Sequence, residues 1–442
     1  MRESLIAKRV YAHINPDANA ARILPPLGFA IWNVSRRCFV ALRRTATPRD
    51  YRASTSSALL GAHSLTSDIA IVGAGITGLS IAFHLAERDA GSIVVYEREG
   101  IGAGASGVQP GGVRQQWSTR FNCLMARDSL AFYSQLEERL SPGVDPGFRP
   151  CGYVFVAHEP ETLERLRGDV ATQNAAGVPS RVATMAELGE LVPELEVAGT
   201  VGASVCTEDG YFDRPQSVVE AFAEAARRLS VVISHGDVRS IESTGSGWRL
   251  RLADGAQGEA EHVIVAASFD TRLLLRPLGV DLPIVAENRW LFFSDPISER
   301  LLDPLVVAVD RRFAAKQLGD GRVLASDLSA ADADDADAET MRRHVKQAAV
   351  ELFPRFEYLA PPLLVRGVYD NTPDRQAIVG PVPGHDGLYV AAGFSGHGFM
   401  IAPEIGRGVA AMVRGEAPGE TFAHLRPDRF QTGRLAYESA VV

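Results

Sequence analysis

The clearest hydrophobic pattern begins at residue 68 and predicts a strand, a turn, a helix and a second strand. Asp68–Val72 is a short continuous apolar run of the kind that forms a buried parallel strand. Apolar residues then recur at helical spacing over Leu79–Arg88, and a second apolar run covers Ser92–Tyr96. Because parallel strands need a crossover between them, this order predicts one β–α–β unit of about 30 residues.

The middle of the chain predicts a different arrangement, in which strands follow one another closely. Two helices are expected there, Glu159–Ala176 and Gln216–Leu229, and the strand-like runs around them are Cys151–Ala157, Val231–Ser234, Gly247–Leu252 and His262–Ala267. From residue 282 to residue 326 no helical pattern separates the runs Pro283–Ala286, Trp290–Phe293, Leu305–Val309 and Arg322–Ala325. Strands without crossover helices pair antiparallel, so this stretch predicts an antiparallel sheet.

After that sheet the pattern predicts a helix at Glu339–Phe353. The acidic stretch Asp332–Asp337 is expected to lead into its first turn, where carboxylates suit the helix dipole. Alternation of strand-like and helix-like runs returns after Arg366, with a strand-like run at Gly387–Ala392 and a helix-like run after Phe399. The chain therefore reads as a parallel α/β part that an antiparallel part interrupts.

Composition places the chain among globular proteins and excludes several partner classes. Of 442 residues, 46% are hydrophobic and 22% are charged, and no apolar run approaches the roughly 18 residues of a membrane helix. The net charge of −9 argues against a nucleic-acid surface, which needs a basic excess. The four cysteines lie far apart without a CxxC pair, which predicts neither a disulfide framework nor a metal site.

Residues 1–66 differ in charge from the rest of the chain. Ten Lys or Arg and three Asp or Glu give this part a net +7, whereas the remainder carries 35 basic and 51 acidic residues, a net −16. A basic, acid-poor leader resembles a mitochondrial transit peptide, and the alternative is an extension without a function. We therefore expect a cytoplasmic protein, or a mitochondrial one if the leader is a transit peptide.

The turn after the first strand carries the first candidate chemistry. It reads Gly73-Ala-Gly-Ile-Thr-Gly78 and has a strand before it and a helix after it. In such a GxGxxG turn the first glycine makes the bend, the second lets the backbone approach a pyrophosphate, and the third lets helix and strand pack closely. Glu97 follows the next strand, where a carboxylate accepts hydrogen bonds from ribose hydroxyls. The unit is a predicted dinucleotide site.

A second glycine-rich loop favours FAD over NAD as the dinucleotide. It covers Gly100–Arg114 and contains six glycines. An extended backbone of this kind suits a flat ring system and a diphosphate, whereas a nicotinamide-only domain has no evident need for it. The position of the β–α–β unit at the start of the predicted fold also favours FAD.

Several motifs together resemble the FAD-dependent D-amino-acid oxidase superfamily, in particular its sarcosine oxidase and dimethylglycine dehydrogenase branch. The motifs are Ile71–Gly78, Gly102–Arg114, Glu208–Asp213, Val263–Ala267, Tyr369–Asp374 and the stretch Gly393-Phe-Ser-Gly-His-Gly-Phe399. The tail Arg429–Arg434 is similar to that of bacterial relatives of the mitochondrial FAD-dependent oxidoreductase-domain proteins. The resemblance spans roughly residues 67–430.

The resemblance implies an α/β fold, α+β overall, in which a Rossmann-like FAD-binding domain is interrupted by an antiparallel-sheet substrate domain. We predict that the FAD-binding domain comprises residues 67–148, 196–280 and 366–442. The predicted substrate domain comprises residues 149–195 and 281–365. Residues 1–66 are the predicted basic extension, disordered or used for targeting.

The glycine motifs and the resemblance together give a predicted set of cofactor contacts. In the family, the C-terminal glycine-rich segment passes the flavin ring, and the helix after it points at the ring. The predicted contacts are Gly73, Gly75, Ile76, Thr77, Gly78, Glu97, Arg98, Gly104, Ala105, Ser106, Val238, Ala267, Gly393, Ser395, Gly396, His397, Gly398 and Phe399. No metal site is predicted.

Three residues are predicted to act in catalysis. Arg114 stands where sarcosine oxidases hold an arginine that grips the substrate carboxylate, and its alternative role is to support the phosphate loop. Tyr369 matches a family active-site tyrosine, with strand packing as the alternative. His397 is a candidate base or flavin donor, with orientation of the loop as the alternative. Arg114 and Tyr369 are also predicted substrate contacts, together with Met400.

Two departures from the family pattern bear on the substrate and on the cofactor. Met400 stands where monomeric sarcosine oxidase carries a carboxylate-binding lysine, which argues against sarcosine itself and suggests a larger or more apolar substrate. Gly367 stands where that branch attaches FAD through a cysteine, so we predict non-covalent FAD.

The resemblance implies an FAD-dependent oxidoreductase that removes a hydride from the carbon next to an amine, giving an imine that hydrolyses. The expected partners are a small amine or amino acid and either O2 or another electron acceptor. Only Lys316 and Lys346 lie within the fold as candidates for a lysine that promotes reaction with O2, which favours a dehydrogenase. A non-catalytic flavin-containing assembly factor and a 2-hydroxy-acid dehydrogenase are the alternatives.

Overall fold

The computed structural model describes residues 65–328 and 338–440. Its strands are β1 Leu65–Val72, β2 Ile93–Glu97, β3 Gly112–Val113, β4 Phe148–Arg149, β5 Tyr153–Ala157, β6 Arg181–Ala183, β7 Gly202–Cys206, β8 Gly210–Phe212, β9 Val232–His235, β10 Val238–Ser243, β11 Trp248–Leu252, β12 Gln257–Val265, β13 Val285–Phe293, β14 Leu305–Ala308, β15 Phe313–Gln317, β16 Val323–Asp327, β17 Leu363–Asn371, β18 Ile378–Pro381 and β19 Leu388–Ala392.

The α-helices are α3 Ile76–Ala86, α4 Ala105–Val108, α5 Arg120–Ser134, α6 Leu136–Leu140, α7 Pro160–Ala175, α8 Met185–Leu191, α9 Pro215–Arg228, α10 Thr271–Leu275, α11 Ala338–Leu352, α12 Gly398–Val413 and α13 Arg429–Thr432. Short 3₁₀ helices are η1 Ser268–Asp270, η2 Arg276–Leu278, η4 Pro354–Tyr358 and η5 Glu420–His424. The predicted β–α–β unit is β1, α3 and β2, and most of the other predicted elements differ only at their ends.

The first sheet has the order β10-β11-β12-β1-β2-β9, with β19 beside β12 and β18 beside β19. Strand β12 pairs parallel with β1 along one edge, and its other edge is shared between antiparallel β11 and parallel β19. Strands β2 and β9 continue the parallel arrangement. The carboxyl ends of β9, β2, β1, β12 and β19 therefore meet at one edge of the sheet, where open α/β sheets bind their ligands.

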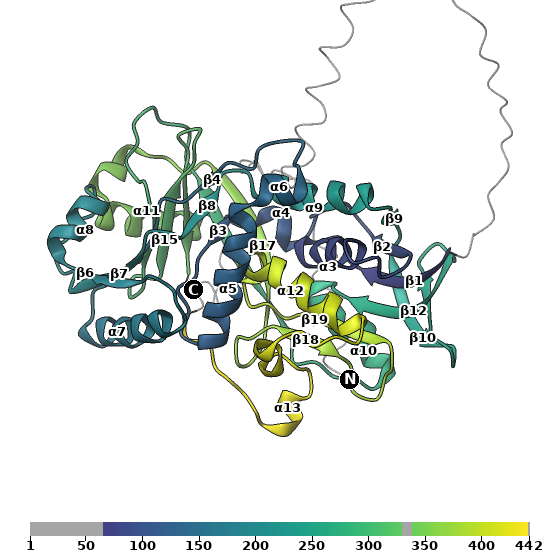
Figure 1. Cartoon of the computed structure of the whole chain (residues 1–442). Helices are drawn as coiled ribbons and strands as arrows, with labels where there is room; N and C mark the ends of the chain where they lie inside the picture. Colours follow the sequence, from purple (N-terminus) through teal and green to yellow (C-terminus); the bar gives the residue numbers. More distant parts are fainter. Residues whose placement is uncertain (1–64, 329–337, 441–442) are drawn as a thin grey trace, which may run out of the picture.

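Alternation along β1 explains how this sheet is covered on both faces. Ile69 and Ile71 pack into the core beneath α3, α5, α9 and α12, whereas Ala70 and Val72 pack into the core on the opposite face. Figure 1 shows α3 and α12 next to each other in the middle of the molecule. Because every side chain of these residues is buried, the strand reads as a continuous apolar run.

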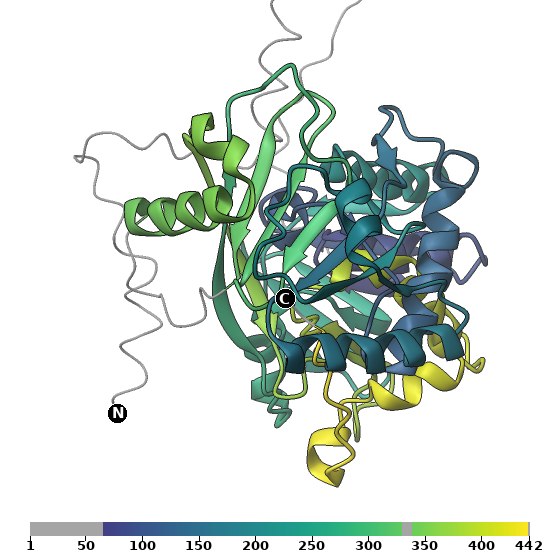
Figure 2. The same ribbon diagram turned by 90° about the vertical axis from the view of Figure 1, so that its left-hand side faces the viewer.

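The second sheet has the order β17-β13-β16-β15-β14-β5-β7-β6. It lies on the other side of the molecule, with α7, α8 and α11 beside it (Figures 1 and 2). The predicted antiparallel pairing is confirmed among β13, β14, β15, β16 and β17. On its other edge β14 pairs parallel with β5, which lies outside the predicted antiparallel stretch. The predicted runs Pro283–Ala286 and Trp290–Phe293 are parts of one strand, β13, and β15 was not predicted.

Strand pairing also bears on the predicted domain boundaries. β7 pairs with β5 and β6 in the second sheet, although residues 196–280 were assigned to the FAD-binding domain. β17 spans the predicted boundary at residue 366 and pairs with β13 throughout. β1 begins at Leu65, two residues inside the predicted extension. The domain division otherwise stays a prediction, and residues 1–64 and Asp332–Asp337 lie outside the described residues.

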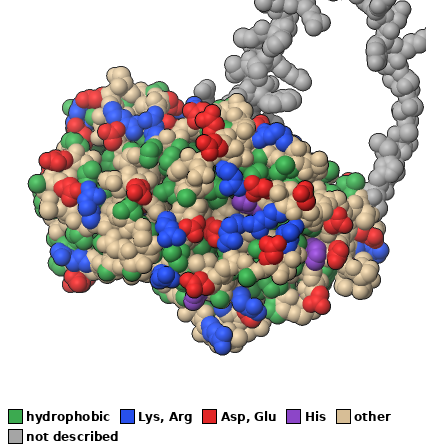
Figure 3. All heavy atoms as spheres, in the orientation of Figure 1, with side chains coloured by type: hydrophobic (Ala, Val, Ile, Leu, Met, Phe, Trp, Pro, Cys, Tyr) green, Lys and Arg blue, Asp and Glu red, His purple; other side chains and the backbone are tan. Residues whose placement is uncertain are grey.

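The surface in Figure 3 mixes Lys and Arg with Asp and Glu over the whole visible face. Within residues 65–328 and 338–440, no helix combines the length and apolar content needed to cross a membrane. The same residues contain no group of three His, Cys, Asp or Glu side chains that would hold a metal ion.

Candidate active site

The glycine turn after β1 has the tight geometry that its sequence predicts. Gly73 adopts φ +109°, and a Cβ there would stand 2.5 Å from the Ala266 carbonyl oxygen. A Cβ on Gly78 would overlap the Gly73 carbonyl oxygen itself. Side chains at these two positions would push α3 away from the strands, so both glycines are required by the packing.

Two side chains from outside the turn hold its backbone in place. Glu97, at the end of β2, accepts a hydrogen bond from the Ala74 amide at 2.9 Å and another from the Glu99 amide at 2.8 Å. Ser106 Oγ accepts from the Ile76 amide at 3.0 Å. The predicted ribose residue therefore also orders the turn, and the second glycine loop crosses the N-terminus of α3.

The second loop leaves open space beside this helix end. Gly104 and Ala105 are exposed, and a Cβ on Gly104 would meet nothing within 4 Å. Gly102 donates to the Ala74 carbonyl at 3.0 Å, which ties the two loops together. The first amides of a helix lack partners within the helix, and the dipole adds partial positive charge there. The two loops thus form a cradle of backbone suited to an anionic diphosphate.

The remaining predicted contacts on this side lie at the same sheet edge. Ala267 follows β12 and has its Cα 3.5 Å from where a Gly73 Cβ would stand. Val238 is buried at the start of β10, and the Gly236 amide before it donates to the Glu97 carbonyl at 2.8 Å. Arg98 pairs with Asp270 of η1 at 2.7 Å.

The C-terminal glycine loop, residues 393–397, is held by one buried carboxylate. Asp370 Oδ2 accepts from the Gly393 amide at 2.8 Å and Oδ1 from the Phe394 amide at 3.1 Å. Ser395 lies in the left-handed region at φ +49°, and its Oγ accepts from the Thr372 amide at 3.1 Å. Sequence reasoning missed Asp370, although it lies within a quoted motif. Burial raises its pKa to about 6.

Helix α12 begins at this loop and runs alongside α3 in the same direction. Ser80 Oγ donates to the Ala402 carbonyl at 2.8 Å, and Gly406, one turn further on, packs against Ser80 and His84. Ser80 and Ala402 each lie one turn inside their helices. The N-termini of the two helices therefore lie side by side at the same edge of the first sheet. Figure 1 shows the two helices together.

His397 precedes α12 and is buried, with neither ring nitrogen hydrogen-bonded to any described residue. Its ring packs on Trp117 with the centroids 4.9 Å apart. Burial holds the pKa of His397 well below its ordinary value, so the imidazole is neutral at neutral pH. Two unpartnered nitrogens in a buried ring are costly unless a bound group satisfies them.

Arg114 follows β3 and is also buried. Its guanidinium carbon lies 3.6 Å from the centre of the Trp117 ring, one terminal nitrogen donates to the Gln116 carbonyl, and the other donates to the Ala440 carbonyl at 2.5 Å. Its Nε has no partner among the described residues. The predicted carboxylate-binding residue is therefore held by an aromatic ring and by the C-terminal segment, Tyr437–Ala440.

Tyr369 and Met400 have different surroundings. Gly396 of the C-terminal loop lies against the Tyr369 ring, and the Arg289 guanidinium carbon lies 4.9 Å from its centre. Burial raises the pKa of the Tyr369 phenol, and the charges of Arg289 and Arg114 oppose that shift. Met400 is half-buried on α12 and packs against the first hydrophobic core. The structure thus brings Arg114, Tyr369 and the C-terminal loop into one region, with Met400 on the helix behind it.

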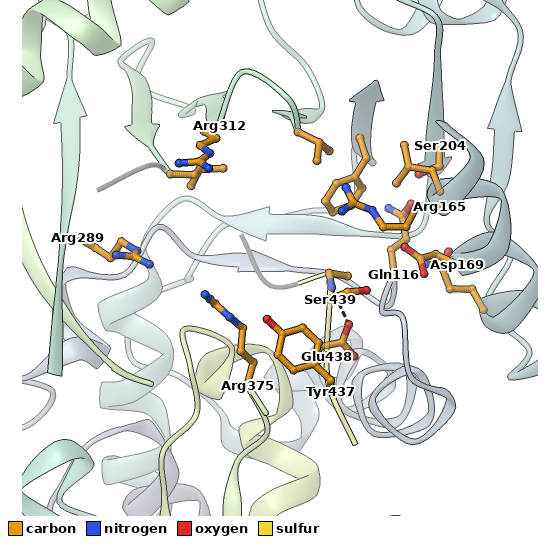
Figure 4. Close-up of a pocket in the computed structure, with 16 residues that line it drawn as sticks. Gln116, Arg165, Asp169, Ser204, Arg289, Arg312, Arg375, Tyr437, Glu438 and Ser439 are labelled. Carbon is orange, nitrogen blue, oxygen red and sulfur yellow. Dashed lines mark hydrogen bonds between the residues drawn. The ribbon is translucent and has the colours of Figure 1, made fainter. Parts of the chain in front are cut away.

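A cavity of about 370 Å³ opens beside these residues (Figure 4). Its polar lining residues include Gln116, Arg165, Asp169, Ser204, Arg289, Arg312, Arg375, Tyr437, Glu438 and Ser439. Sequence reasoning missed these side chains, because they come from separate segments and none stands in a recognisable motif. The cavity lies at the substrate side of the predicted site rather than at the glycine turn.

The C-terminal segment lines this cavity and is fastened to α5. Glu438 is fully buried, and its carboxylate accepts from the Ser118 amide at 2.9 Å, the Thr119 amide at 3.2 Å and the Asn122 side chain at 2.9 Å. Burial opposes ionisation of Glu438, but these hydrogen bonds hold its pKa below the ordinary value. Glu438 therefore caps the N-terminus of α5 from the far end of the chain.

Comparison with known proteins identifies relatives over most of the chain. The model of the FAD dependent oxidoreductase family, DAO, matches residues 68–412. FAD-dependent oxidoreductase domain-containing protein 1 from Bos taurus is 30% identical over 85% of this chain and 87% of its own length. 4-Methylaminobutanoate oxidase (formaldehyde-forming) from Paenarthrobacter nicotinovorans is 28% identical, over 81% of this chain and 45% of its own length. The crystal structure of L-proline dehydrogenase from P. horikoshii matches 85% of this chain and 100% of its own, with TM-score 0.78 and 25% identity.

Proposed function

The chain belongs to the FAD-dependent oxidoreductase family, and we propose that it oxidises an amine or amino acid at the carbon next to the nitrogen. The substrate would lose a hydride from that carbon and a proton from the nitrogen, and the imine product would hydrolyse in water. FAD, when bound, supplies the two-electron acceptor for this chemistry. The amine-oxidising and proline-oxidising relatives support the substrate class.

The residues present fit the cofactor. The two glycine loops form a backbone cradle at the N-terminus of α3. Beside the N-terminus of α12, the buried His397 ring offers two nitrogens that no described residue hydrogen-bonds. A Cβ on Gly367 would stand 2.9 Å from Val108, so that position has little room for the cysteine that would carry a covalent link. We therefore propose that FAD is held non-covalently.

The observation that carries this proposal is the parallel pairing of α3 and α12. Their N-termini follow glycine loops that are far apart in the sequence, and they lie side by side at one sheet edge. One helix end suits the diphosphate, and the other suits negative charge at the far end of the same ligand. Neither loop alone has this property.

Arg114 is the candidate for holding the carboxylate of an amino-acid substrate. It is already desolvated, and its Nε has no partner among residues 65–328 and 338–440. A carboxylate is a stronger acceptor for guanidinium than the neutral Ala440 carbonyl that it now contacts. Substrate binding would therefore replace the Ala440 carbonyl by the substrate carboxylate as a partner of Arg114. The C-terminal segment would move aside.

Neither candidate lysine for reaction with O2 is free in this structure. Lys316 is buried and donates to the Phe212 carbonyl at 3.1 Å, and burial lowers its pKa to about 7. Lys346 donates to the carbonyls of Phe356, Glu357 and Leu359. These contacts favour a dehydrogenase that passes its electrons to an acceptor other than O2.

The proposal is tested by anaerobic reduction of the purified, FAD-loaded protein. The visible flavin absorbance is followed with N-methyl amino acids, proline, D-amino acids and 2-hydroxy acids. Bleaching by an amine is the expected result, and bleaching by hydroxy acids alone or by nothing in the panel would overturn it. Air added to the bleached sample separates an oxidase from a dehydrogenase.

The role of Arg114 is tested by substitution. The flavin of Arg114→Ala should bleach far more slowly than that of Arg114→Lys, and normal bleaching of Arg114→Ala would refute the carboxylate role.

A further inference from the structure

Three arginines form one wall of the cavity, and we call them the arginine wall: Arg289, Arg312 and Arg375. Arg289 lies on β13, Arg312 in the turn between β14 and β15, and Arg375 in the turn between β17 and β18. Figure 4 shows the three side chains around one hollow, with Tyr437 beside Arg375. Gln116, Arg165 and Asp169 lie toward the other end of the cavity.

The charges that line the cavity do not balance. Asp169 stands one turn from Arg165 on α7, and the Glu438 carboxylate is taken up by donors at the start of α5. Arg289 shares its charge with Glu287 at 2.6 Å, but its Nε has no partner among the described residues. The guanidinium groups of Arg312 and Arg375 form no ion pair or hydrogen bond within the described part of the chain. Among the described residues, the arginine wall therefore carries more positive charge than its neighbours neutralise.

The backbone at two of these positions is unusual for arginine. Arg312 has φ +49° and Arg375 has φ +56°, both in the left-handed region. Glycine and asparagine adopt such turn conformations at lower cost, so neither turn requires an arginine. Non-glycine residues in this region concentrate at functional sites. A binding role for the Arg312 and Arg375 side chains would explain why arginine stands at two turn positions where the backbone favours glycine or asparagine.

The arginine wall lies next to the predicted substrate residues. Arg289 stacks over Tyr369, which contacts the C-terminal glycine loop. Gln116 lines the cavity, and its carbonyl accepts from Arg114. The cavity thus adjoins Tyr369 through Arg289 and Arg114 through Gln116, and its volume of about 370 Å³ suits a small amino acid.

We propose that the arginine wall binds a second acidic group of the substrate, so that the substrate is an amine bearing two carboxylates. Arg114 would hold the carboxylate next to the reacting carbon, and Arg289, Arg312 and Arg375 would hold the other. This inference rests on the proposed amine oxidation for its substrate. The presence of an anion site in the cavity is testable without turnover.

The first test measures equilibrium binding by calorimetry on the FAD-loaded protein, with glutarate and butyrate as probes. The two differ by one carboxylate, so glutarate should bind about tenfold or more tightly. Arg312→Gln and Arg375→Gln should each remove most of that difference. Arg311→Gln is the matched control, because Arg311 and Arg312 are both exposed in the same turn but only Arg312 lines this cavity. Equal binding of the two probes, or equal loss in Arg311→Gln, would overturn the proposal.

The second test compares anaerobic bleaching by N-methylglutamate and by N-methylnorvaline, which lacks the side-chain carboxylate. N-methylglutamate should reduce the flavin at least about tenfold more efficiently, and Arg375→Gln should erase the preference mainly through KM. If neutral amines bleach the protein as well and glutarate does not bind, the acidic-substrate proposal fails and amine oxidation stands. If glutarate binds at the wall but no amine bleaches, amine oxidation fails and the anion site stands.

Discussion

The two ends of the site are built from different parts of the protein. At the glycine turn, the surfaces that face a ligand are backbone atoms at helix ends, fixed by Glu97 and Ser106 from nearby segments. At the cavity, they are side chains from many separate segments, including the arginine wall and the C-terminal segment. A backbone site tolerates little change in volume, whereas a side-chain site tolerates volume changes and depends on charge. Substitutions at the two ends should therefore differ in whether added volume or lost charge has the larger effect.

The largest effect is expected at the glycine turn. Gly78→Ala places a Cβ against the Gly73 carbonyl oxygen, which cannot move without distorting β1. We expect a loss of about 3 kcal/mol or more in the free energy of unfolding and little bound flavin. Thermal unfolding and the ratio of flavin to protein absorbance measure the two effects.

Gly104→Ala is the matched control for this substitution, because its Cβ would meet nothing within 4 Å. It should keep its stability. Equal stability of the two variants would contradict the claim that the turn is limited by space.

The next effect concerns the pH dependence of the C-terminal loop. Burial raises the pKa of Asp370 to about 6 from 3.8, so the folded protein holds this proton more tightly than the unfolded chain. Stability of the wild type should therefore fall as pH rises from about 4 to about 6, by an amount on the order of 3 kcal/mol for this group. Asp370→Asn removes the titration.

The measurement is chemical unfolding of both proteins across that pH range. The wild-type free energy of unfolding minus that of Asp370→Asn should decrease with rising pH and then level off. A constant difference would show that Asp370 does not titrate there and that the loop is held in another way.

The sequence predicts elements with local signals, such as those around the glycine turn, better than elements that depend on contacts between distant segments. β1, α3 and β2 were predictable because hydrophobic period, glycine spacing and the acid after β2 are local signals. β15 was missed because Lys316 and Gln317 break its apolar pattern, yet both are buried and bonded to distant carbonyls. β7 was not predicted as a strand, and its pairing with β5 and β6 is not stated by its own sequence.

The site was predictable to a similar extent. The glycines of the C-terminal loop were evident from the sequence. The role of Asp370 was not, because only the fold brings the end of β17, where Asp370 lies, next to that loop. Arg312 is exposed and Arg375 is half-buried, each in a turn, and nothing in the local sequence places the two on one cavity. Glu438 lies near the end of the chain, and its bonds to α5 join residues more than 300 positions apart.

A smaller effect is expected where the cavity depends on the C-terminal segment. Glu438→Gln weakens the cap on α5 and should cost about 1–2 kcal/mol at neutral pH. Because the folded-state pKa of Glu438 is depressed, its contribution is present above its ordinary pKa and is lost as pH falls through the folded value. The deficit of the variant should therefore shrink in acid.

Chemical unfolding at pH 7 and at acidic pH checks this prediction. Glu420→Gln is the control, because that side chain is 80% exposed and pairs with Arg120 only at 3.4 Å. Its stability should change by less than about 0.5 kcal/mol. A deficit in Glu438→Gln that grows in acid would contradict the capping role.

The smallest change in stability is expected at Tyr369. Tyr369→Phe keeps the ring that packs against Gly396 and Arg289 and removes a hydroxyl that has no hydrogen-bond partner among the described residues. The free energy of unfolding should change by less than about 0.5 kcal/mol. If the hydroxyl contacts substrate, anaerobic bleaching by the best amine should nevertheless slow by about tenfold.

Tyr133→Phe is the control for stability, since the Tyr133 hydroxyl donates to the Phe399 carbonyl at 2.6 Å and its loss should lower the free energy of unfolding by about 1 kcal/mol. Unchanged bleaching in Tyr369→Phe would leave that ring with a packing role, and the substrate side of the site would then rest on Arg114 and the arginine wall.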